Sequence, residues 1–427
     1  MENPFFSWYP GPSSAVVTAI RELPDGLESR AKWIVVENEE TKATVYMLGD
    51  GLNAKPSAKI IRNEAVKVVD AVFCANLWKI VILYEDFALH LVEPANGRVV
   101  KKTFLKRGLN KDSVATAFAM RGVGPIVAVG YTLDQSVPKA ERKKNKKKYE
   151  DYDEEDAIMH CIDLIDIRSP EVPEKTYEDL HSSTIQSLNF CPTAPNILLT
   201  GGADGLVNWV DVDVTTPEDG LMATNSVVSP VSTVGFVGND SEGKTLAYGT
   251  TDDGRSEFYR MFHSNKPEEF DVEVTFQRSP PKDSNRFLVD IIGSGDERLP
   301  FVTVESSEDG QVTMTATSTD GKQHQDLGTF KGHKELVRCV FSDTAQRRIV
   351  TGDDAGGAIG RCFKEVRAEL IQDTVEEMEE SEGEEEAAKV PAKKKSRIVK
   401  KKLKTKNGKV VKKKAKKIVK KKTKKSV

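Results

Sequence analysis

The chain has 427 residues, 38% of them hydrophobic, which is enough for one large domain or two medium ones with a buried core. Its 63 basic and 66 acidic residues give a formal net charge of −3, and its five cysteines show no C-x-x-C spacing, which argues against a disulfide framework or a zinc site. The longest apolar stretches, such as residues 80–84, are far too short to span a membrane, and no basic segment with an apolar run follows Met1, so we expect a soluble intracellular protein.

Short runs of β-branched and aromatic residues, each bounded by turn signals, recur over the first 360 residues and predict an all-β fold. The runs form seven units spaced 46 to 56 residues apart, except for the third, which spans 71, and β-propeller blades repeat at roughly 40 to 50 residues. We therefore expect residues 1–364 to form a seven-bladed β-propeller, in which radial stacking buries the faces of the blades. The seven units are expected to begin near Val16, Val66, Val114, Ile185, Val231, Phe287 and Leu336.

Within a unit, four strands can be followed. In the second unit they are expected at residues 66–74, 79–84, 87–92 and 98–104, joined by short turns. In the sixth unit the Asp309-Gly310 and Asp320-Gly321 pairs mark the turns of the same meander, because Asp-Gly suits the positive φ angles of tight hairpins.

The length of the third unit has a visible cause. Residues 139–156 (KAERKKNKKKYEDYDEED) form a basic block followed by an acidic block, which is too charged to enter a sheet and predicts a disordered insertion between strands. The unit then ends on Asp166-Ile167-Arg168. This triplet resembles the W-D-x-R ending through which some propellers dock onto a cullin ubiquitin ligase adaptor, so Asp166 and Arg168 are possible docking residues. Asp-x-Arg also closes many ordinary blades.

The fourth unit contains the sequence ILLTGGADGLVNWVD at residues 197–211, which resembles the core of WD repeats. In those repeats His, Ser or Thr, Asp and Trp form a buried hydrogen-bonded tetrad that pins a hairpin. His181, Thr200 and Asp204 fill three of the places, whereas Val210 falls in the Trp position and Trp209 lies one residue early. We therefore expect an incomplete tetrad.

The fifth unit contains GNDSEGKT at residues 238–245, which satisfies the G-x-x-x-x-G-K-T pattern of a phosphate-binding loop. A true phosphate-binding loop leads into a helix, whereas Leu246 and the residues after it have the pattern of a strand. Asp240 and Glu242 would also repel a nucleotide, and the apolar run ending at Asp290 is too common a string to count as the acidic partner motif. The segment is therefore predicted to be a hairpin loop between two strands.

The seventh unit supplies His333 and Thr351 as tetrad-like residues, with Asp354 displaced by one position and Arg361 in the Trp position. Its last strand is expected to be poor. We expect the N-terminal segment, residues 4–12, to help close the ring at this blade.

A closer resemblance covers about a third of the chain. Residues 157–238 contain a D-A-x-x-x-x-x-D-x-x-D-x-R stretch, the run LHSSTIQSLNFCPTAPN and the run EDGLMATNSV, and the last unit contains GHKELVRCVF and VTGDD. These segments resemble the family of WD repeat-containing protein 89, with a weak match before Val114. The resemblance implies a propeller of six or seven blades without known catalysis and with a poorly defined molecular role.

Nothing in the sequence predicts an enzyme, a cofactor or a metal. No G-x-S-x-G or H-E-x-x-H pattern occurs, and no Cys or Ser carries a recognisable catalytic signature. The few histidines are scattered, and for His181 and His333 a structural role in a tetrad is favoured over catalysis. The six are His90, His160, His181, His263, His324 and His333.

The charges divide the chain into an acidic body and a basic tail. Residues 389–427 hold 21 Lys plus Arg and no Asp or Glu, which leaves −24 on residues 1–388. Residues 365–388 are predicted to be an acidic linker and residues 389–427 a disordered tail, whose lysines fit nuclear-import patterns and would bind RNA or DNA without sequence preference. The basic clusters are Lys393, Lys394, Lys395, Arg397, Lys400, Lys401, Lys402, Lys412, Lys413, Lys414, Lys416, Lys417, Lys420, Lys421 and Lys422.

These features predict a non-enzymatic scaffold or adaptor in the nucleus, and more specifically the nucleolus. The propeller faces would bind protein partners while the tail tethers the protein to RNA-rich particles, in keeping with ribosome assembly. We expect a monomer within complexes, with no membrane and no small-molecule substrate. The alternatives for the protein are a substrate receptor of a cullin ubiquitin ligase and a chromatin-associated adaptor. The alternative for the tail is a solvated segment that binds nothing.

Overall fold

We describe a computed structural model of the chain. It describes residues 4–10, 15–25, 31–105, 113–134, 158–262, 270–280, 285–344, 346–363, 366 and 372–373, all within one unit, Met1–Val375. The predicted insertion at 139–156, the tail at 389–427 and nearly all of the acidic linker lie outside the described residues. No helix in the described ranges is long and apolar enough to cross a membrane.

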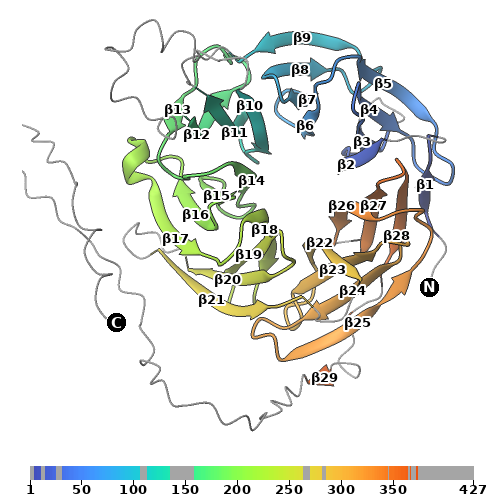
Figure 1. The fold of residues 1–427 in the computed structure, drawn as a ribbon, viewed down its shortest axis with the longest axis vertical. Helices are drawn as coiled ribbons and strands as arrows, with labels where there is room; N and C mark the ends of the chain where they lie inside the picture. The colour runs from blue at the N-terminus through green and yellow to red at the C-terminus, as the bar shows by residue number, and fades with distance from the viewer. Residues whose placement is uncertain are drawn as a thin grey trace, which may run out of the picture. The chain divides into compact units, whose positions relative to one another are not determined.

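Seven antiparallel sheets stand around a central axis as the blades of a propeller (Figure 1). The prediction of an all-β, seven-bladed fold is confirmed, and the innermost strand of every blade begins within two residues of the position expected from the sequence. The innermost strands are β2 (Val16–Glu22), β6 (Val68–Cys74), β10 (Val114–Met120), β14 (Ile185–Phe190), β18 (Val231–Asn239), β22 (Arg286–Gly293) and β26 (Val337–Asp343).

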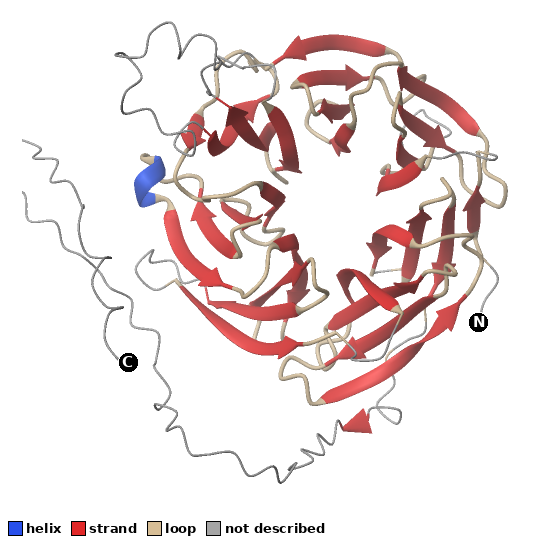
Figure 2. Ribbon diagram, viewed as in Figure 1, coloured by secondary structure: helices blue, strands red, loops and turns tan. Residues whose placement is uncertain are grey.

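Each blade is a meander whose strands follow one another from the axis outward (Figure 2). The second strands are β3 (Trp33–Asn38), β7 (Lys79–Tyr84), β11 (Ile126–Asp134), β15 (Ile197–Gly202), β19 (Thr245–Thr251), β23 (Phe301–Ser307) and β27 (Arg348–Asp353). The third strands are β4 (Ala43–Leu48), β8 (Ala88–Val92), β12 (Ile158–Asp166), β16 (Leu206–Asp211), β20 (Ser256–Phe262), β24 (Val312–Thr317) and β28 (Ala358–Cys362). The outer strands are β5 (Pro56–Arg62), β9 (Val99–Phe104), β13 (Lys175–Tyr177), β17 (Leu221–Ser226), β21 (Asp271–Arg278), β25 (Gln323–Phe330) and β1 (Phe6–Trp8).

The N-terminal strand closes the ring, as the sequence predicts. β1 pairs with β28 through Phe6↔Gly360, Ser7↔Ile359 and Trp8↔Ala358, so the seventh blade takes its outer strand from the opposite end of the propeller sequence. The Phe6 side chain is fully buried, and its ring centroid lies 5.4 Å from that of Trp33 in the first blade. The closure is therefore held by backbone pairing within one blade and by aromatic packing between two.

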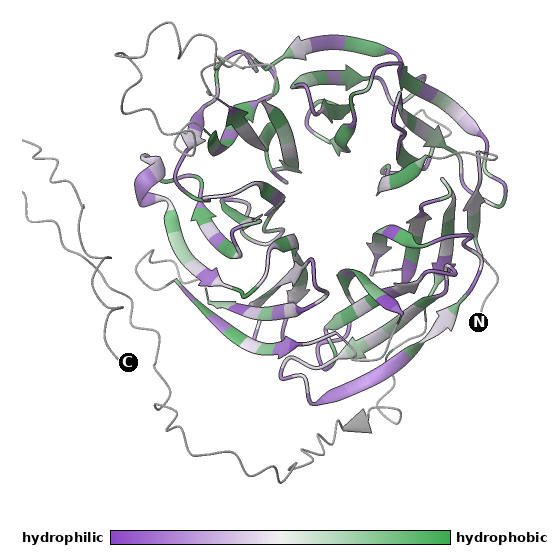
Figure 3. Ribbon diagram, in the orientation of Figure 1, coloured by the Kyte–Doolittle hydropathy of each residue, from purple (hydrophilic) through white to green (hydrophobic). Residues whose placement is uncertain are grey.

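The core lies between neighbouring blades, which explains the strand patterns. Val81 and Leu83 of β7 share one apolar cluster with Phe118 of β10 and Val129 of β11 in the next blade. All five residues of β8 are buried, whereas burial alternates along the outer strand β9, where only one side of the strand meets the protein. In Figure 3 the apolar colouring accordingly concentrates on the inner and middle strands.

Two small elements complete the described part of the chain. A 3-10 turn (η2, Pro217–Asp219) connects β16 to β17. β29 (Gln372–Asp373) pairs with β25 as a fifth strand of the sixth blade, so the sheet extends past residue 364 into the stretch predicted to be an acidic linker.

Candidate functional site

His181 ties the connector that enters the fourth blade to the hairpin between β15 and β16. Its Nδ1 lies 3.0 Å from Oδ1 of Asp204 and its Nε2 lies 2.8 Å from Oγ1 of Thr200. Burial alone would raise the pKa of Asp204, but hydrogen bonds from His181 and from the Ser182 and Leu206 amides outweigh burial and lower it. Asp204 is therefore an ionised anchor for the connector.

His333 makes the same arrangement in the seventh blade, with a different aspartate from the one singled out in the sequence. Nε2 lies 2.7 Å from Oγ1 of Thr351, and Nδ1 lies 2.9 Å from Oδ2 of Asp353. Asp354 points elsewhere and accepts two hydrogen bonds from Nε of Arg338, at 2.8 and 2.9 Å. The two hairpins have the same register, since Gly201↔Val207 and Gly352↔Ala358 each enclose five residues, so Asp353 stands at the position of Gly202 and Ala355 at that of Asp204. The aspartate that faces the histidine therefore comes from the last residue of β27 in the seventh blade and from the turn in the fourth.

Polar side chains on the third strands also hold the connectors: Asn208, two residues before the Trp position filled by Val210, and Arg361, in the Trp position itself. In the fourth blade Asn208 lies opposite Thr200, and its Nδ2 donates to the Leu180 carbonyl at 2.8 Å. In the seventh blade Arg361 donates to the Lys331 carbonyl at 2.7 Å. Both side chains tie a connector carbonyl to the third strand of the blade, a role that spacing alone did not reveal for Asn208.

The phosphate-loop-like segment is a β-hairpin between β18 and β19, as predicted, and Thr245 begins a strand. Asp240 is buried and accepts hydrogen bonds from the backbone N–H groups of Glu242 and Lys244, both at 2.9 Å. The Lys244 ammonium pairs with Glu242 and lies 4.1 Å from the Phe262 ring centroid. The Asp240 carboxylate thus accepts the hydrogen bonds from the backbone amides that a phosphate-binding loop would use to hold a phosphate.

Asp166 and Arg168 lie at the end of β12, and a fourth strand, β13, follows, so the triplet closes the third strand and not the blade. Nε of Arg168 donates to both Asp166 oxygens at 3.0 Å, and the Arg168 side chain is 65% exposed. The pair is preorganised and accessible at the surface.

Every innermost strand contains a β-bulge near its start, and the seven bulges line the central channel. A bulge leaves one residue unpaired in the ladder and re-aims the neighbouring side chains. The channel encloses about 600 Å³, and all seven bulge residues lie on its wall. They are Thr18, Val69, Thr116, Gln186, Ser232, Val289 and Arg338.

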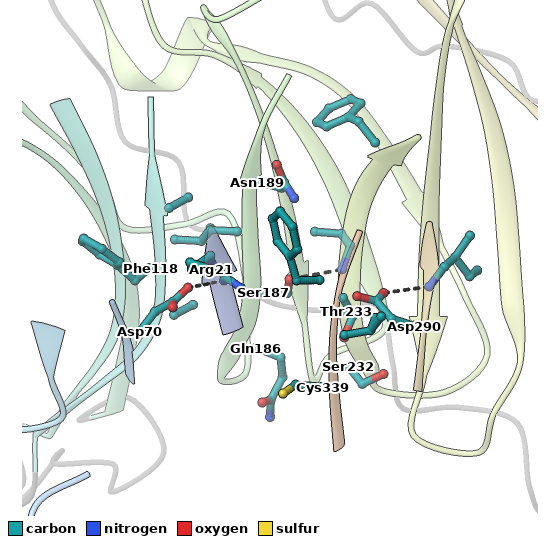
Figure 4. Close-up of a pocket in the computed structure, with 18 of the residues that line it drawn as sticks. Arg21, Asp70, Phe118, Gln186, Ser187, Asn189, Ser232, Thr233, Asp290 and Cys339 are labelled. Carbon is teal, nitrogen blue, oxygen red and sulfur yellow. Dashed lines mark hydrogen bonds and ion pairs between the residues drawn. The ribbon is translucent and has the colours of Figure 1, made fainter. Parts of the chain in front are cut away.

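The channel wall carries charged residues that the sequence analysis did not identify as a group. Nη2 of Arg21 lies 2.5 Å from Oδ2 of Asp70 on the neighbouring blade. In the sixth blade, Asp290 accepts hydrogen bonds from the Tyr248 hydroxyl at 2.7 Å and from the Ile291 amide at 2.8 Å. Figure 4 shows the joined Arg21 and Asp70 on one side of the channel and Asp290 on another. The signal in the sequence is a charged residue inside an otherwise apolar strand, as in VVDAV and FLVDII.

The environment of Asp290 perturbs its titration. Burial raises the pKa of Asp290 to about 6, although the hydrogen bonds from Tyr248 and Ile291 and the charge of Arg21 oppose this rise. Burial, followed by the nearby Asp290 carboxylate, raises the pKa of the Tyr248 hydroxyl well above its usual range, so Tyr248 acts as a donor. Burial also raises the pKa of the Cys339 thiol, on the same wall, to about 12.

No group of three or more His, Cys, Asp or Glu residues that could hold a metal forms within the described ranges. The basic clusters from Lys393 to Lys422 and residue His263 lie outside those ranges, so their predicted roles stay predictions.

Together the seven closed blades and the two His–Asp–Thr networks define a β-propeller of WD-repeat character. A chain in the crystal structure of the mitotic checkpoint complex matches this fold with a TM-score of 0.53 and 12% sequence identity, over 84% of this chain and 94% of that chain. At this identity the likeness shows the fold. No family model matches the chain, and membership of the family of WD repeat-containing protein 89 stays a prediction.

Proposed function

We propose that the protein is a non-enzymatic scaffold of the nucleus, and more specifically the nucleolus, whose propeller faces bind protein partners. The observation that carries this proposal is the closed ring, which leaves connectors and hairpins on two faces as its accessible surface. Its best-placed acid–base candidates, His181 with Asp204 and His333 with Asp353, are buried in hydrogen bonds that hold those connectors. The matching chain is itself part of a complex, which supports a role as one copy within a larger assembly.

The basic tail, residues 389–427, supports nuclear import and non-specific affinity for RNA or DNA. Each lysine close to a phosphate backbone releases a condensed counterion, so binding would be strong at low salt and weak at high salt. Such a tail would hold the acidic propeller on RNA-rich particles, and ribosome assembly is the process that fits best.

The test compares the full chain with a chain ending at residue 388, purified from cells at about 50 mM and 200 mM salt. We expect RNA to co-purify with the full chain at low salt only, to sediment with pre-ribosomal particles, and to be lost with the tail. Proteins bound to the propeller should remain. A third chain that lacks residues 376–386 but keeps the tail is the matched control and should retain RNA. RNA recovery that does not change on tail deletion refutes the tethering role, and recovery of DNA in place of RNA favours a chromatin-associated adaptor.

A second candidate function is that of a substrate receptor for a cullin ubiquitin ligase. It is favoured by the exposed Arg168 side chain, which Asp166 holds in a fixed orientation at the end of β12. Arg168→Ala should then abolish capture of the ligase adaptor while leaving the melting temperature unchanged. Arg121→Ala, which removes a neighbouring guanidinium paired with Asp213, is the control and should leave capture intact.

A further inference from the structure

Asp70 and Asp290 occupy equivalent positions in the second and sixth blades. Each is the first residue after the bulge of its innermost strand, opposite Leu83 and Val304 respectively. Each also accepts the amide N–H of the next residue, at 2.7 Å for Asp70 and 2.8 Å for Asp290. The two carboxylates are therefore presented to the channel in the same way.

The two positions differ in their counter-ion. Asp70 is paired with the Arg21 guanidinium at 2.5 Å, whereas no Lys, Arg or His of the described residues forms an ion pair with Asp290. The other guanidinium on the wall, Arg338, is paired with Asp354 at 2.7 Å. Of the two carboxylates on the channel wall, Asp290 is therefore the one without an ion-pair partner among the described residues.

We propose that the central channel binds the cationic side chain of a basic peptide, with the Asp290 carboxylate as its counter-ion and the Tyr248 hydroxyl holding that carboxylate in place. A guanidinium or ammonium at Asp290 would complete the pairing that Arg21 supplies to Asp70. The volume of about 600 Å³ admits a long side chain, and Thr233 and Ser232 line the wall beside Asp290 (Figure 4).

A second hollow continues from the channel across the fifth and sixth blades and provides room for the peptide backbone. It encloses about 500 Å³ and shares Ser232, Thr233, Val289 and Arg338 with the channel. Phe287, which is 46% exposed, and Pro280 give it an apolar wall. Its charged lining is balanced, with the carboxylates of Asp252, Asp253 and Glu305 and the guanidinium groups of Arg278, Arg286 and Arg338. A peptide lying there would reach Asp290 with one basic side chain.

Binding at Asp290 would be one specific contact within the proposed binding of protein partners, and only the source of the peptide rests on that proposed function. The basic side chain is supplied by a separate protein, and occupancy by the lysines of residues 389–427 is the alternative outcome that the last experiment below distinguishes. The chemistry at Asp290 is the same in both cases.

The test uses the full chain and a small probe, N-acetyl-arginine N-methylamide, with the uncharged citrulline analogue for comparison, in calorimetric titrations at pH 7.5. We expect the arginine probe to bind at least about tenfold more tightly than the citrulline probe, and Asp290→Asn to remove this preference. Asp179→Asn, which removes an exposed carboxylate from the connector between β13 and β14, should leave it unchanged. Equal affinity of the wild-type protein for both probes, failure of the arginine probe to bind, or full affinity in Asp290→Asn overturns the proposal.

A second readout keeps the test independent of the stability of the variant. Affinity of the wild-type protein for the arginine probe should fall as the pH drops from about 7 towards 4, because protonated Asp290 cannot act as a counter-ion. Arg21, Arg338, Asp70, Tyr248 and Cys339 face the same space, and of these Tyr248 and Cys339 stay protonated throughout that range. Probe affinity that is constant over this range contradicts the assignment.

The source of the natural ligand is distinguished by repeating the titration with a chain ending at residue 388. If the tail fills the channel, the truncated chain should bind the arginine probe more tightly than the full chain. Equal affinity assigns the channel to a separate basic protein. The RNA experiment above does not involve Asp290, so either proposal can fail without the other.

Discussion

The Nδ1 atom of His333 lies 2.9 Å from Oδ2 of Asp353, and both side chains are fully buried. The other oxygen of Asp353 accepts the amide N–H of Ala355 at 3.1 Å and that of Gly357 at 2.6 Å. One carboxylate therefore holds both the connector into the seventh blade and the turn between β27 and β28.

Removal of this carboxylate should destabilise the ring strongly. Asp353→Ala leaves buried donors without a partner, and we expect the free energy of unfolding to fall by about 3–5 kcal/mol. Its neighbour Asp354 pairs with the half-exposed Arg338, so Asp354→Ala should cost at most about 1 kcal/mol. Urea unfolding followed by tryptophan fluorescence measures both values, and similar losses in the two variants contradict the assignment of the anchor to Asp353.

The hairpin between β18 and β19 should depend on Asp240 and not on Lys244. Asp240→Ala deprives two amides of their acceptor and Arg260 of its ion-pair partner, and should cost about 2–3 kcal/mol. Lys244→Ala removes a partly exposed ion pair and should cost less than about 1 kcal/mol. Equilibrium dialysis with magnesium and ATP should detect no binding to the wild-type protein. Binding of ATP that Lys244→Ala abolishes refutes the structural interpretation of this loop.

His90 should make the protein sensitive to mild acid. Burial, and then the charges of Lys102 and Arg62, lower the pKa of His90 to about 4 from an ordinary value of 6.5. The unfolded chain therefore binds a proton at a higher pH than the folded protein, and this contribution to stability is lost as the pH falls from about 6.5 towards 4.

His90→Phe preserves the aromatic packing against Tyr84, whose ring centroid lies 4.8 Å away, and removes the titrating group. We expect the melting temperature of the wild-type protein to fall further between pH 7 and pH 4.5 than that of the variant. Parallel melting curves in differential scanning calorimetry would show that His90 does not carry this dependence.

Phe6 should be essential for ring closure despite its place in a three-residue strand. Because its side chain is fully buried between two blades, Phe6→Ala should cost about 3–5 kcal/mol. Val228→Ala, at a site that is 87% exposed, is the control and should change stability by less than about 0.5 kcal/mol. Chemical unfolding of both variants decides whether the first blade and the seventh are held together by this side chain.

The strands could be predicted well from the sequence because their signals are local. In the second blade the expected strand at residues 79–84 is β7 itself, and the other three differ from the structure by no more than two residues at either end. Turn residues and alternating burial act within ten residues of each other, so pattern and structure agree. His181, Thr200 and Asp204 were found for the same reason, since they span a single connector and hairpin.

Features that depart from the repeat pattern or depend on contacts between blades could not be predicted. Asp353 faces His333 from the position that Gly202 occupies in the fourth blade, and not from the position of Asp204. Arg21 and Asp70 lie 49 residues apart in adjacent blades, and Tyr248 and Asp290 lie 42 residues apart. Only closure of the circle brings these side chains to one channel, so each looked like an isolated polar residue in an apolar strand.

The pairing of β1 with β28 also sets the order of events during biosynthesis. Phe6 leaves the translation machinery roughly 350 residues before Gly360, its partner across the sheet. At 5–20 residues per second this is a delay of roughly 20–70 s, during which an apolar strand waits with an open edge. Nascent chains should therefore need a chaperone over this interval, and a fusion partner placed directly before Pro4 should interfere with the last step of folding.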